Sequence, residues 1–510
     1  MRSRFQPSEL RTAKLWWIVS LDFGGRTWRV SQAPLSIEST DAGRWLSVSA
    51  GLDTAEAQLT APWMGTAPER RSISLELSIP ELDVGMLLSR GYELDSAPVE
   101  VALWREGDQW EDRLQILRGQ ITSYEWGAKG EALALEAEEA VELDRGLLPP
   151  PGATVSAQTW PGAPEDALGA PYPWILGAPG SDGTPASPAC YIDVVPRNLL
   201  LVAGHPVSAV SVVVSDGTST ESLLIEHLSD GAGRLVAVVD LDTATTIAVD
   251  PTLTYSVAWT TGGGLVGPTG EALTAGTVIE AILAHSTLPI DRGSLSAARS
   301  YLDAWKIGAY IVEPISPMEW VTDALLPLLP VALLTGPSGW RIVPTPLEPT
   351  QSRTIGTLTA SQSIRRDGRV RRIGRDEVAN RVELLYGIET TDGEPRSSAV
   401  VGPAWDGVEH PALSTRLSAQ IYGIQPRSEE TVAVYDDATA MRIVRHIASI
   451  YAYPRDVVTY TGQRLQWLQP ADILWISDSD LHLERAGWVE SIRLTPDTAT
   501  VDFILWRVNA

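Results

Sequence analysis

One order of short segments occurs twice in the 510-residue chain, near residues 99–136 and again near residues 473–506. In each copy a Leu-Trp pair, ending at Trp104 or Trp475, precedes a polar turn, an apolar strand with a glycine, a second turn and an alternating strand. The order and spacing repeat, although the individual residues do not. Short strands separated by turns at this spacing predict an antiparallel barrel or sandwich. The repeat therefore predicts two related β domains in one chain.

A helix is predicted just before the second copy. Asp436 or Asp437 can cap it, and apolar residues recur at helical spacing from Met441 to Tyr451. The segment from Gln463 to Asp478 then predicts a strand, a turn centred on a proline and another strand. A further strand is predicted for residues 431–435, which follow a long loop.

Two helix starts are predicted in the middle of the chain. Thr277 and Glu280 have the spacing of a capping box, which predicts a helix through His285. Ser316 is followed by a proline and, three residues on, by Glu319, and this pattern predicts a second helix.

A chain of this length is expected to divide into roughly 3–4 domains. The segments predict a mainly β, multidomain protein with a smaller α+β part. The predicted domains are a first β domain at 1–148, a Pro/Gly-rich connector with an inserted β domain at 149–270, a small α+β domain at 271–345 and a second β domain at 346–510.

Composition narrows the possible partners and cofactors. The net charge is −25, and a chain this acidic is a poor general binder of nucleic acid because phosphate contacts need an excess of Lys and Arg. The charge serves either solubility or a surface that DNA passes without sticking. A single cysteine, Cys190, allows no internal disulfide and no thiolate cluster. We expect no membrane insertion and no signal peptide, because no run approaches the ~20 apolar residues of a bilayer span.

The sequence predicts no enzyme, no cofactor, and no catalytic or metal-binding residues. It contains no P-loop, no HExxH motif and no Gly-x-Ser-x-Gly motif. Glu136, Glu138, Glu139 and Glu142 could supply a glycosidase pair, but a solvated charged face explains them more simply. The six histidines are scattered: His205, His227, His285, His410, His446 and His482.

One charge cluster stands out in this acidic chain, and it consists of arginines. Arginine suits pairing with carboxylates or phosphates. The cluster could form an ion-pair seam between subunits or a ring of positive charge in a lumen, and the simpler alternative is an exposed loop with fortuitous charge. Its members are Arg365, Arg366, Arg369, Arg371, Arg372, Arg375 and Arg381.

Three short motifs carry a resemblance to a known group. Leu468-Gln-Pro-Ala-Asp472 resembles the Leu-x-Pro-Gly-Asp hairpin of bacteriophage tail hub and baseplate hub proteins and of related gene-transfer particles, with Ala471 in the glycine position. Residues 380–386 resemble the Asn-x-Val-x-Val-x-Tyr strand of that group, and residues 118–121 resemble the strand that closes its first barrel. The resemblance covers the chain in outline.

The resemblance implies a structural virion protein at the distal end of a tail. Such hubs are homotrimers with two tail-tube-like β barrels per subunit, so three subunits match a sixfold tube to a threefold tip. Implied partners are the tail tube or distal tail protein, a central spike or fibre protein and possibly a tape-measure protein, with DNA passing through without specific binding. Large subunit interfaces would also use the 19 tryptophans, which compare with only three phenylalanines.

Two other functions stay open. Trp-rich β domains can stack on sugars, so a receptor-binding or carbohydrate-binding tail module is one alternative. A tail-associated cell-wall hydrolase is the other, although its catalytic part would have to lie within the spare segment 150–270.

Overall fold

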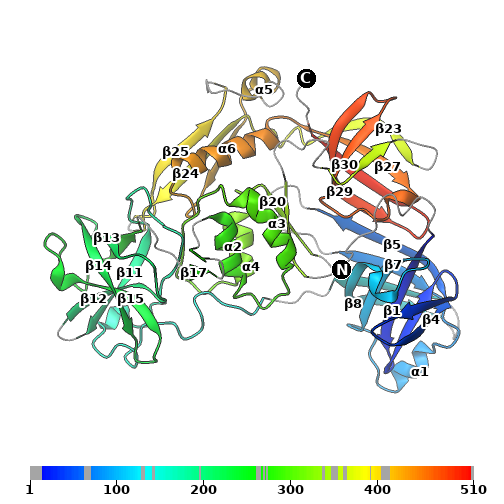
Figure 1. Cartoon of the computed structure of the whole chain (residues 1–510), viewed down its shortest axis with the longest axis horizontal. Helices are drawn as coiled ribbons and strands as arrows, with labels where there is room; N and C mark the ends of the chain where they lie inside the picture. Colours follow the sequence, from blue (N-terminus) through cyan, green and yellow to red (C-terminus); the bar gives the residue numbers. More distant parts are fainter. Residues whose placement is uncertain are drawn as a thin grey trace.

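The computed structural model describes residues 14–61, 71–127, 132–139, 144–194, 197–259, 266–267, 270–271, 274–335, 339–345, 354–359, 364–390, 392–403 and 414–506. Figure 1 shows three parts: a β barrel on the left, helices in the centre, and β strands from both ends of the chain on the right. The prediction of a mainly β, multidomain chain with a smaller α+β part is confirmed.

The strands from the two ends of the chain form one 15-stranded sheet. Its main path runs β23-β27-β30-β29-β5-β6-β9-β8-β7-β1-β2-β4-β3; off this path, β28 pairs with β29 and β22 pairs with β28. The N-terminal strands are β1 (Leu15–Phe23), β2 (Arg26–Ser31), β3 (Leu35–Ser39), β4 (Arg44–Ala50), β5 (Leu52–Thr60), β6 (Ser72–Leu77), β7 (Pro98–Arg105), β8 (Leu114–Trp126) and β9 (Leu133–Glu139). The C-terminal strands are β22 (Thr357–Thr359), β23 (Arg365–Ile373), β27 (Arg455–Gly462), β28 (Ile473–Asp478), β29 (Leu483–Leu494) and β30 (Ala499–Leu505).

The repeat predicted from the sequence is present as a repeated strand order. The order β5-β6-β9-β8-β7 in the first unit corresponds to β23-β27-β30-β29-β28 in the second. Both repeated glycines lie where a side chain would clash with the neighbouring strand: a Cβ on Gly119 would be 1.9 Å from the Glu138 carbonyl oxygen, and one on Gly487 would be 2.4 Å from the Ile476 side-chain atom Cδ1. Helix α1 (Val84–Ser89), whose N-cap is Asp83, lies in the first unit.

The inserted β segment forms a closed six-stranded barrel, whereas the two repeated units share the open sheet. Residues such as Leu200, Val214 and Val239 fill the barrel, and none is more than 1% exposed. The thiol of Cys190, on the first barrel strand, has a pKa raised to about 11 by burial. The barrel strands are β11 (Ser187–Val194), β12 (Arg197–Ala203), β13 (Ser211–Ser215), β14 (Thr220–Ser229), β15 (Leu235–Asp240) and β16 (Tyr255–Ala258).

The centre of the molecule is an α+β assembly. One hydrophobic core holds residues of α2, α3, β20 and β21 together with β24, β25 and α6, so it includes residues on both sides of residue 346. Its helices are α2 (Ala275–Leu283), α3 (Arg292–Leu302), α4 (Pro317–Trp320), followed by a π turn (Val321–Leu325), α5 (Thr415–Tyr422) and α6 (Asp437–Tyr451). The smaller sheets are β24 (Arg381–Ile388), β25 (Pro395–Val401) and β26 (Pro426–Glu430); β20 (Val331–Leu334) and β21 (Arg341–Pro344); β10 (Trp174–Leu176) and β19 (Ala309–Ile311); and β17 (Val266–Gly267) and β18 (Gly270–Glu271).

The central assembly is fixed to the large sheet by apolar and polar contacts. Ala332 and Leu334 of β20 pack on Trp488 and Ile504 of the sheet. The buried guanidinium of Arg71 donates to the carbonyl oxygens of Ile116 and Thr335, one on each part. None of the helices in the described part of the chain has the length and apolarity of a bilayer crossing.

Three local predictions are wrong. Residues 463–465 form a 3-10 turn rather than a strand; the strand of this region, β27, ends just before them. The capping box of α2 is formed by Thr274 and Thr277, so this helix starts before the predicted box. The predicted strand at 431–435 is irregular, and the strand lies just before it at β26, which pairs in parallel with β24. The caps at Ser316 and Asp436 are confirmed.

The buried Asn380 side chain fixes the entry into β24, and we expect Asn380→Ala to lower the free energy of unfolding by about 2 kcal/mol. Its amide nitrogen donates to Ser418 Oγ at 3.1 Å and to the Gly423 carbonyl at 2.8 Å, and its oxygen accepts from the Gln425 N–H at 2.8 Å. Alanine would leave that N–H without its acceptor. Urea unfolding followed by circular dichroism measures the loss, and the exposed Ser398→Ala serves as control. A loss equal to that of the control would contradict the assignment.

Candidate functional site

Around the junction of its two repeated units, the large sheet has one polar face and one apolar face; farther along, the polar face gives way to Trp488 and Ile504, which β20 covers. Strict alternation along strands such as β6 sends successive side chains to opposite faces. One row of directly opposite residues crosses eight strands and is polar throughout: Arg365, Thr461, Thr500, Arg493, Gln58, Ser72, Glu138 and Gln120. A neighbouring row on the other face is buried and apolar: Ala499, Leu494, Ala57, Ile73, Ala137 and Ile121.

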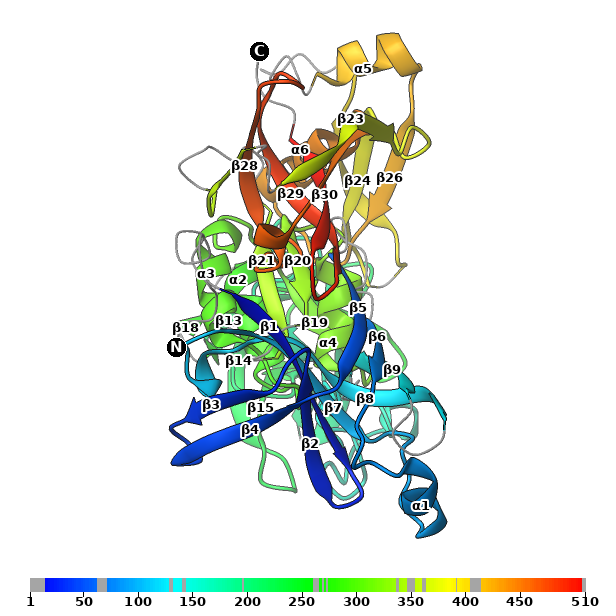
Figure 2. The same ribbon diagram turned by 90° about the vertical axis from the view of Figure 1, so that its right-hand side faces the viewer.

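A strand junction joins the two repeated units into this sheet. The end of β29 pairs with the end of β5, from Ser491 opposite Thr60 to Leu494 opposite Ala57. The Ala61 N–H continues the ladder by donating to the Glu490 carbonyl at 2.8 Å. Figure 2 shows the strands of the second unit above those of the first, and the pairing of β29 with β5 joins them into one sheet. The apolar face of the sheet is covered at this junction: Leu494 is 1% exposed and Ala57 is 0% exposed.

An ion pair crosses the junction on the polar face, between Arg493 Nε and Glu56 Oε1 at 3.1 Å. Both side chains are more than half exposed. We expect a double-mutant cycle with Arg493→Ala and Glu56→Ala to give a coupling below about 1 kcal/mol, which decreases as salt is added. Urea unfolding at low and high salt measures it. A coupling above about 2 kcal/mol that salt leaves unchanged would contradict this expectation.

The structure places five of the seven predicted arginines on one edge strand. Arg365, Arg366, Arg369, Arg371 and Arg372 belong to β23, whereas Arg375 follows in the turn and Arg381 starts β24 in another sheet. The side chain of Arg366 lies outside the described residues. The cluster is therefore mainly a basic strand at one edge of the large sheet, not an exposed loop.

Two of these arginines already pair with carboxylates of their own chain. Arg371 lies 3.3 Å from Asp502, which also accepts from Thr459 and Ser491 hydroxyls. Arg372 Nε lies 2.8 Å from Asp456, and this hydrogen bond raises the pKa of Arg372. The strand thus stays attached to the sheet although it carries dense positive charge.

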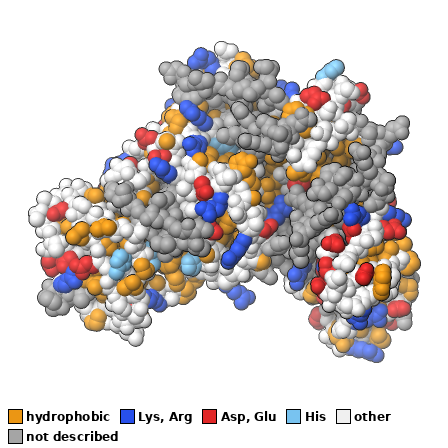
Figure 3. Space-filling model, viewed as in Figure 1, with side chains coloured by type: hydrophobic (Ala, Val, Ile, Leu, Met, Phe, Trp, Pro, Cys, Tyr) orange, Lys and Arg blue, Asp and Glu red, His pale blue; other side chains and the backbone are white. Residues whose placement is uncertain are grey.

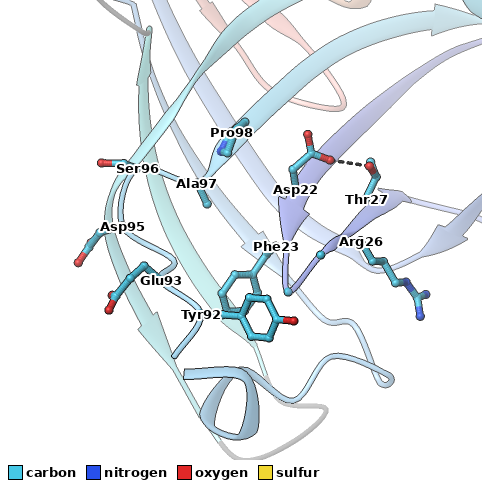
Figure 4. A pocket seen from close by; sticks show the side chains of 12 residues that line it. Asp22, Phe23, Arg26, Thr27, Tyr92, Glu93, Asp95, Ser96, Ala97 and Pro98 are labelled. Carbon is cyan, nitrogen blue, oxygen red and sulfur yellow. Dashed lines mark hydrogen bonds between the residues drawn. The ribbon is translucent and has the colours of Figure 1, made fainter. Parts of the chain in front are cut away.

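A pocket lies at the far end of the first unit, between the β1–β2 turn and residues 92–98 (Figure 4). Its volume is about 590 Å³. Phe23 and Tyr92 give it aromatic surface, and Asp22, Glu93 and Asp95 give it carboxylates. Figure 3 shows acidic and hydrophobic side chains close together over this unit, at the lower right. Among the described residues, no group of three His, Cys, Asp or Glu side chains could hold a metal ion.

Sequence reasoning missed the junction residues Glu56 and Arg493. Strand β5 alternates Glu56 and Gln58 with Ala55, Ala57 and Leu59, so a period of two was present. Two of these three inward residues are alanines, so the alternation of apolar and polar residues in β5 is a weak strand signal.

Comparisons with known proteins give a consistent set. No protein-family model matches the chain, and no curated protein matches it. A tail protein from Neisseria meningitidis MC58 matches at 10% identity and a TM-score of 0.40, over 96% of each chain. The prophage MuSo2 43 kDa tail protein from Shewanella oneidensis matches at 10% identity and a TM-score of 0.35, over 95% of this chain and 98% of that one.

A prophage tail protein from Listeria monocytogenes EGD-e also matches, at 8% identity and a TM-score of 0.31, over 92% of this chain and 93% of that one. All three are named tail proteins, and two of them come from prophages. The Leu-x-Pro-Gly-Asp motif has glycine where this chain has Ala471, and Ala471 has a φ of 65°, in the left-handed region that favours glycine.

Proposed function

We propose that this chain is a structural subunit of a phage-type tail, a homotrimeric hub at the distal end of the virion. The observation that carries the proposal is the β29–β5 junction, which joins two units of the same strand order edge to edge. Three copies supply six such units, the number that a sixfold tail tube presents. The hub would join the tube or distal tail protein to a central spike or fibre protein, with the tape-measure protein as a further possible neighbour.

The polar face would line the channel through which DNA leaves. Its row holds Ser, Thr, Gln and Glu side chains and two arginines, Arg365 and Arg493, so it offers DNA few cationic contacts; Arg493, like Arg371 on the same face, is already paired with a carboxylate. Few free cations on a wall permit passage without the salt-dependent phosphate binding that holds DNA. The Arg cluster would then serve the contact between subunits rather than DNA.

The mass of the purified chain in solution tests the hub assignment. Light scattering should give three times the chain mass of 55.1 kDa. A chain that stays monomeric at every concentration, and also in the presence of the tube protein, would contradict the proposal.

A blocking experiment tests the channel. Ser74→Cys places a thiol on the polar face, and Thr220→Cys places one on the exposed surface of the barrel. Cys190→Ser removes the native thiol. After biotinylation and binding of streptavidin, particles with the label at position 74 should retain their DNA when ejection is triggered. Particles with the label at position 220 should eject it. Equal ejection from both would contradict a channel wall on this face.

The pocket of the first unit supports a second candidate, a receptor-binding or carbohydrate-binding role. Tyr92 is 42% exposed and lines the pocket beside Glu93 and Asp95, an arrangement of aromatic ring and acceptors that suits a sugar. A specific signal on a glycan array that Tyr92→Ala abolishes would favour this role.

A further inference from the structure

The two repeated units have equivalent edges, and only one pair of these edges is joined. Beyond Gly487 and Gly119 the ladders shift register at equivalent places, between Val489 and Ser491 in β29 and between Ile121 and Ser123 in β8. The segment 491–494 therefore corresponds to 123–126. Likewise, the pairing of β5 with β6 and of β23 with β27 makes residues 57–60 correspond to 370–373.

Within the described residues, the unjoined edges have no partner strand from the same chain. Strand β7 pairs with β8 as far as Gln120, and the Ile121 backbone still bonds to Ser96 and Ala97. In the described part of the chain, the segment 123–126 therefore has a ladder partner on one side, which is β9. Strand β23 pairs with β27 on one side and is the end of the sheet among the described residues. An open edge of this kind offers unpaired backbone N–H and C=O groups to another strand.

Side chains at the unjoined edges are more exposed than their counterparts at the internal junction. Leu494 and Ala57, which meet at the internal junction, are 1% and 0% exposed. Their counterparts Trp126 and Val370 are 48% and 38% exposed, although they point to the same face of the sheet. At these core-facing positions, the apolar side chains are thus covered where the two units meet and exposed at the two unjoined edges.

We propose that the 123–126 edge of β8 pairs with the 370–373 edge of β23 in a second copy of this chain, in the register of the internal junction. That register sets Trp126 opposite Val370, Glu125 opposite Arg371, Tyr124 opposite Arg372 and Ser123 opposite Ile373. The proposal rests on the proposed function and names the interface that holds the homotrimer together.

The side chains that would meet are complementary. Glu125 faces Arg371 on the polar face, where the internal junction places Arg493 near Glu56. On the other face, Arg372 meets the ring of Tyr124, and a guanidinium is attracted to an aromatic face. Trp126 and Val370 cover each other and remove apolar surface from water. Two copies that each carry a charge of −25 repel, and a basic strand at the contact offsets part of that repulsion.

Disulfide crosslinking tests this register. In a Cys190→Ser background, the double variant Glu125→Cys/Arg371→Cys places a thiol on each side of the proposed contact. The matched control is Gln58→Cys/Arg493→Cys, whose positions are opposite each other within one chain. On oxidation with copper phenanthroline and air, each pair of thiols forms one disulfide and the oxidant accepts two electrons and two protons.

The control should give a monomeric band with an internal disulfide, and the interface variant should give covalent species of up to three chains. Each single cysteine variant alone should give no species larger than a dimer. If the chain has the mass of a trimer and the control crosslinks but the interface variant does not, the proposed interface is wrong and the hub assignment stands. A monomeric mass at every concentration, with or without the tube protein, would overturn both.

Substitutions at the edge give an independent readout. Trp126→Asp and Glu125→Arg should each weaken self-association at least tenfold in sedimentation, because they place a charge in apolar surface or opposite Arg371. Trp45→Asp is the control, since Trp45 is 64% exposed and lies on β4, away from both edges. Equal association of the Trp126→Asp and Trp45→Asp variants would overturn the proposal.

Discussion

Replacing Trp488 with alanine is expected to lower the free energy of unfolding by about 3–5 kcal/mol, the usual cost of removing a buried aromatic side chain. Trp488 is 0% exposed and lies between the large sheet and β20, in a small cluster with Ala332, Leu334 and Ile504. The cavity left by the indole would also loosen the contact between the sheet and the central α+β assembly. Urea unfolding measures the loss, and hydrogen exchange should show faster exchange in β20 and β21.

The control for this experiment is Trp45→Ala. Trp45 is 64% exposed, so its loss should change the free energy of unfolding by no more than about 0.5 kcal/mol. If both variants lose the same stability, Trp488 does not hold the two parts together.

Replacing His446 with leucine is expected to flatten the pH dependence of stability between about pH 6.5 and pH 4. Complete burial in the central core, against Trp305, lowers the pKa of His446 to about 3 from an ordinary 6.5. The unfolded chain therefore binds a proton at this residue before the folded chain does. Its contribution is fully present above pH 6.5 and falls by up to about 1.4 kcal/mol per pH unit as the pH drops toward 3.

The measurement compares urea unfolding of the wild type and of His446→Leu at pH 7.5 and pH 4.5. The wild type should lose about 2–3 kcal/mol more than the variant over this range. His482→Gln is the control, because His482 is exposed in a turn. Equal losses in the wild type and in His446→Leu would show that this histidine does not limit acid stability.

Local patterns predicted the repeated order of strands, but they did not predict the β29–β5 junction that joins the two units into one sheet. Trp104 and Gly119 lie close together in the chain, as do Trp475 and Gly487, so the repeat can be recognised from the sequence alone. The strand β5 has small inward residues, and its partner β29 lies near the other end of the chain. Pairing at such a separation leaves no periodic signal.

Two further features of the structure depend on tertiary contacts that local patterns do not show. Residues 431–435 have the β-branched alternation of a strand, but the parallel partner of β24 is the polar segment β26. The arginine cluster was visible as a density of charge. That five of its members share the open edge of a sheet depends on the order of strands, which the sequence does not display.

In the proposed trimer the two junctions would carry their charges in opposite order, and this order would disfavour pairing with the wrong strand. At the internal junction the β29 side is basic and the β5 side acidic, through Arg493 and Glu56. At the proposed outer junction the β8 side is acidic and the β23 side basic. If β8 of one copy displaced β29 from β5, Glu125 would approach Glu56, and if β29 met β23, Arg493 would approach Arg371. Both exchanges bring like charges together, so a duplicated chain can tell its own half from its neighbour's.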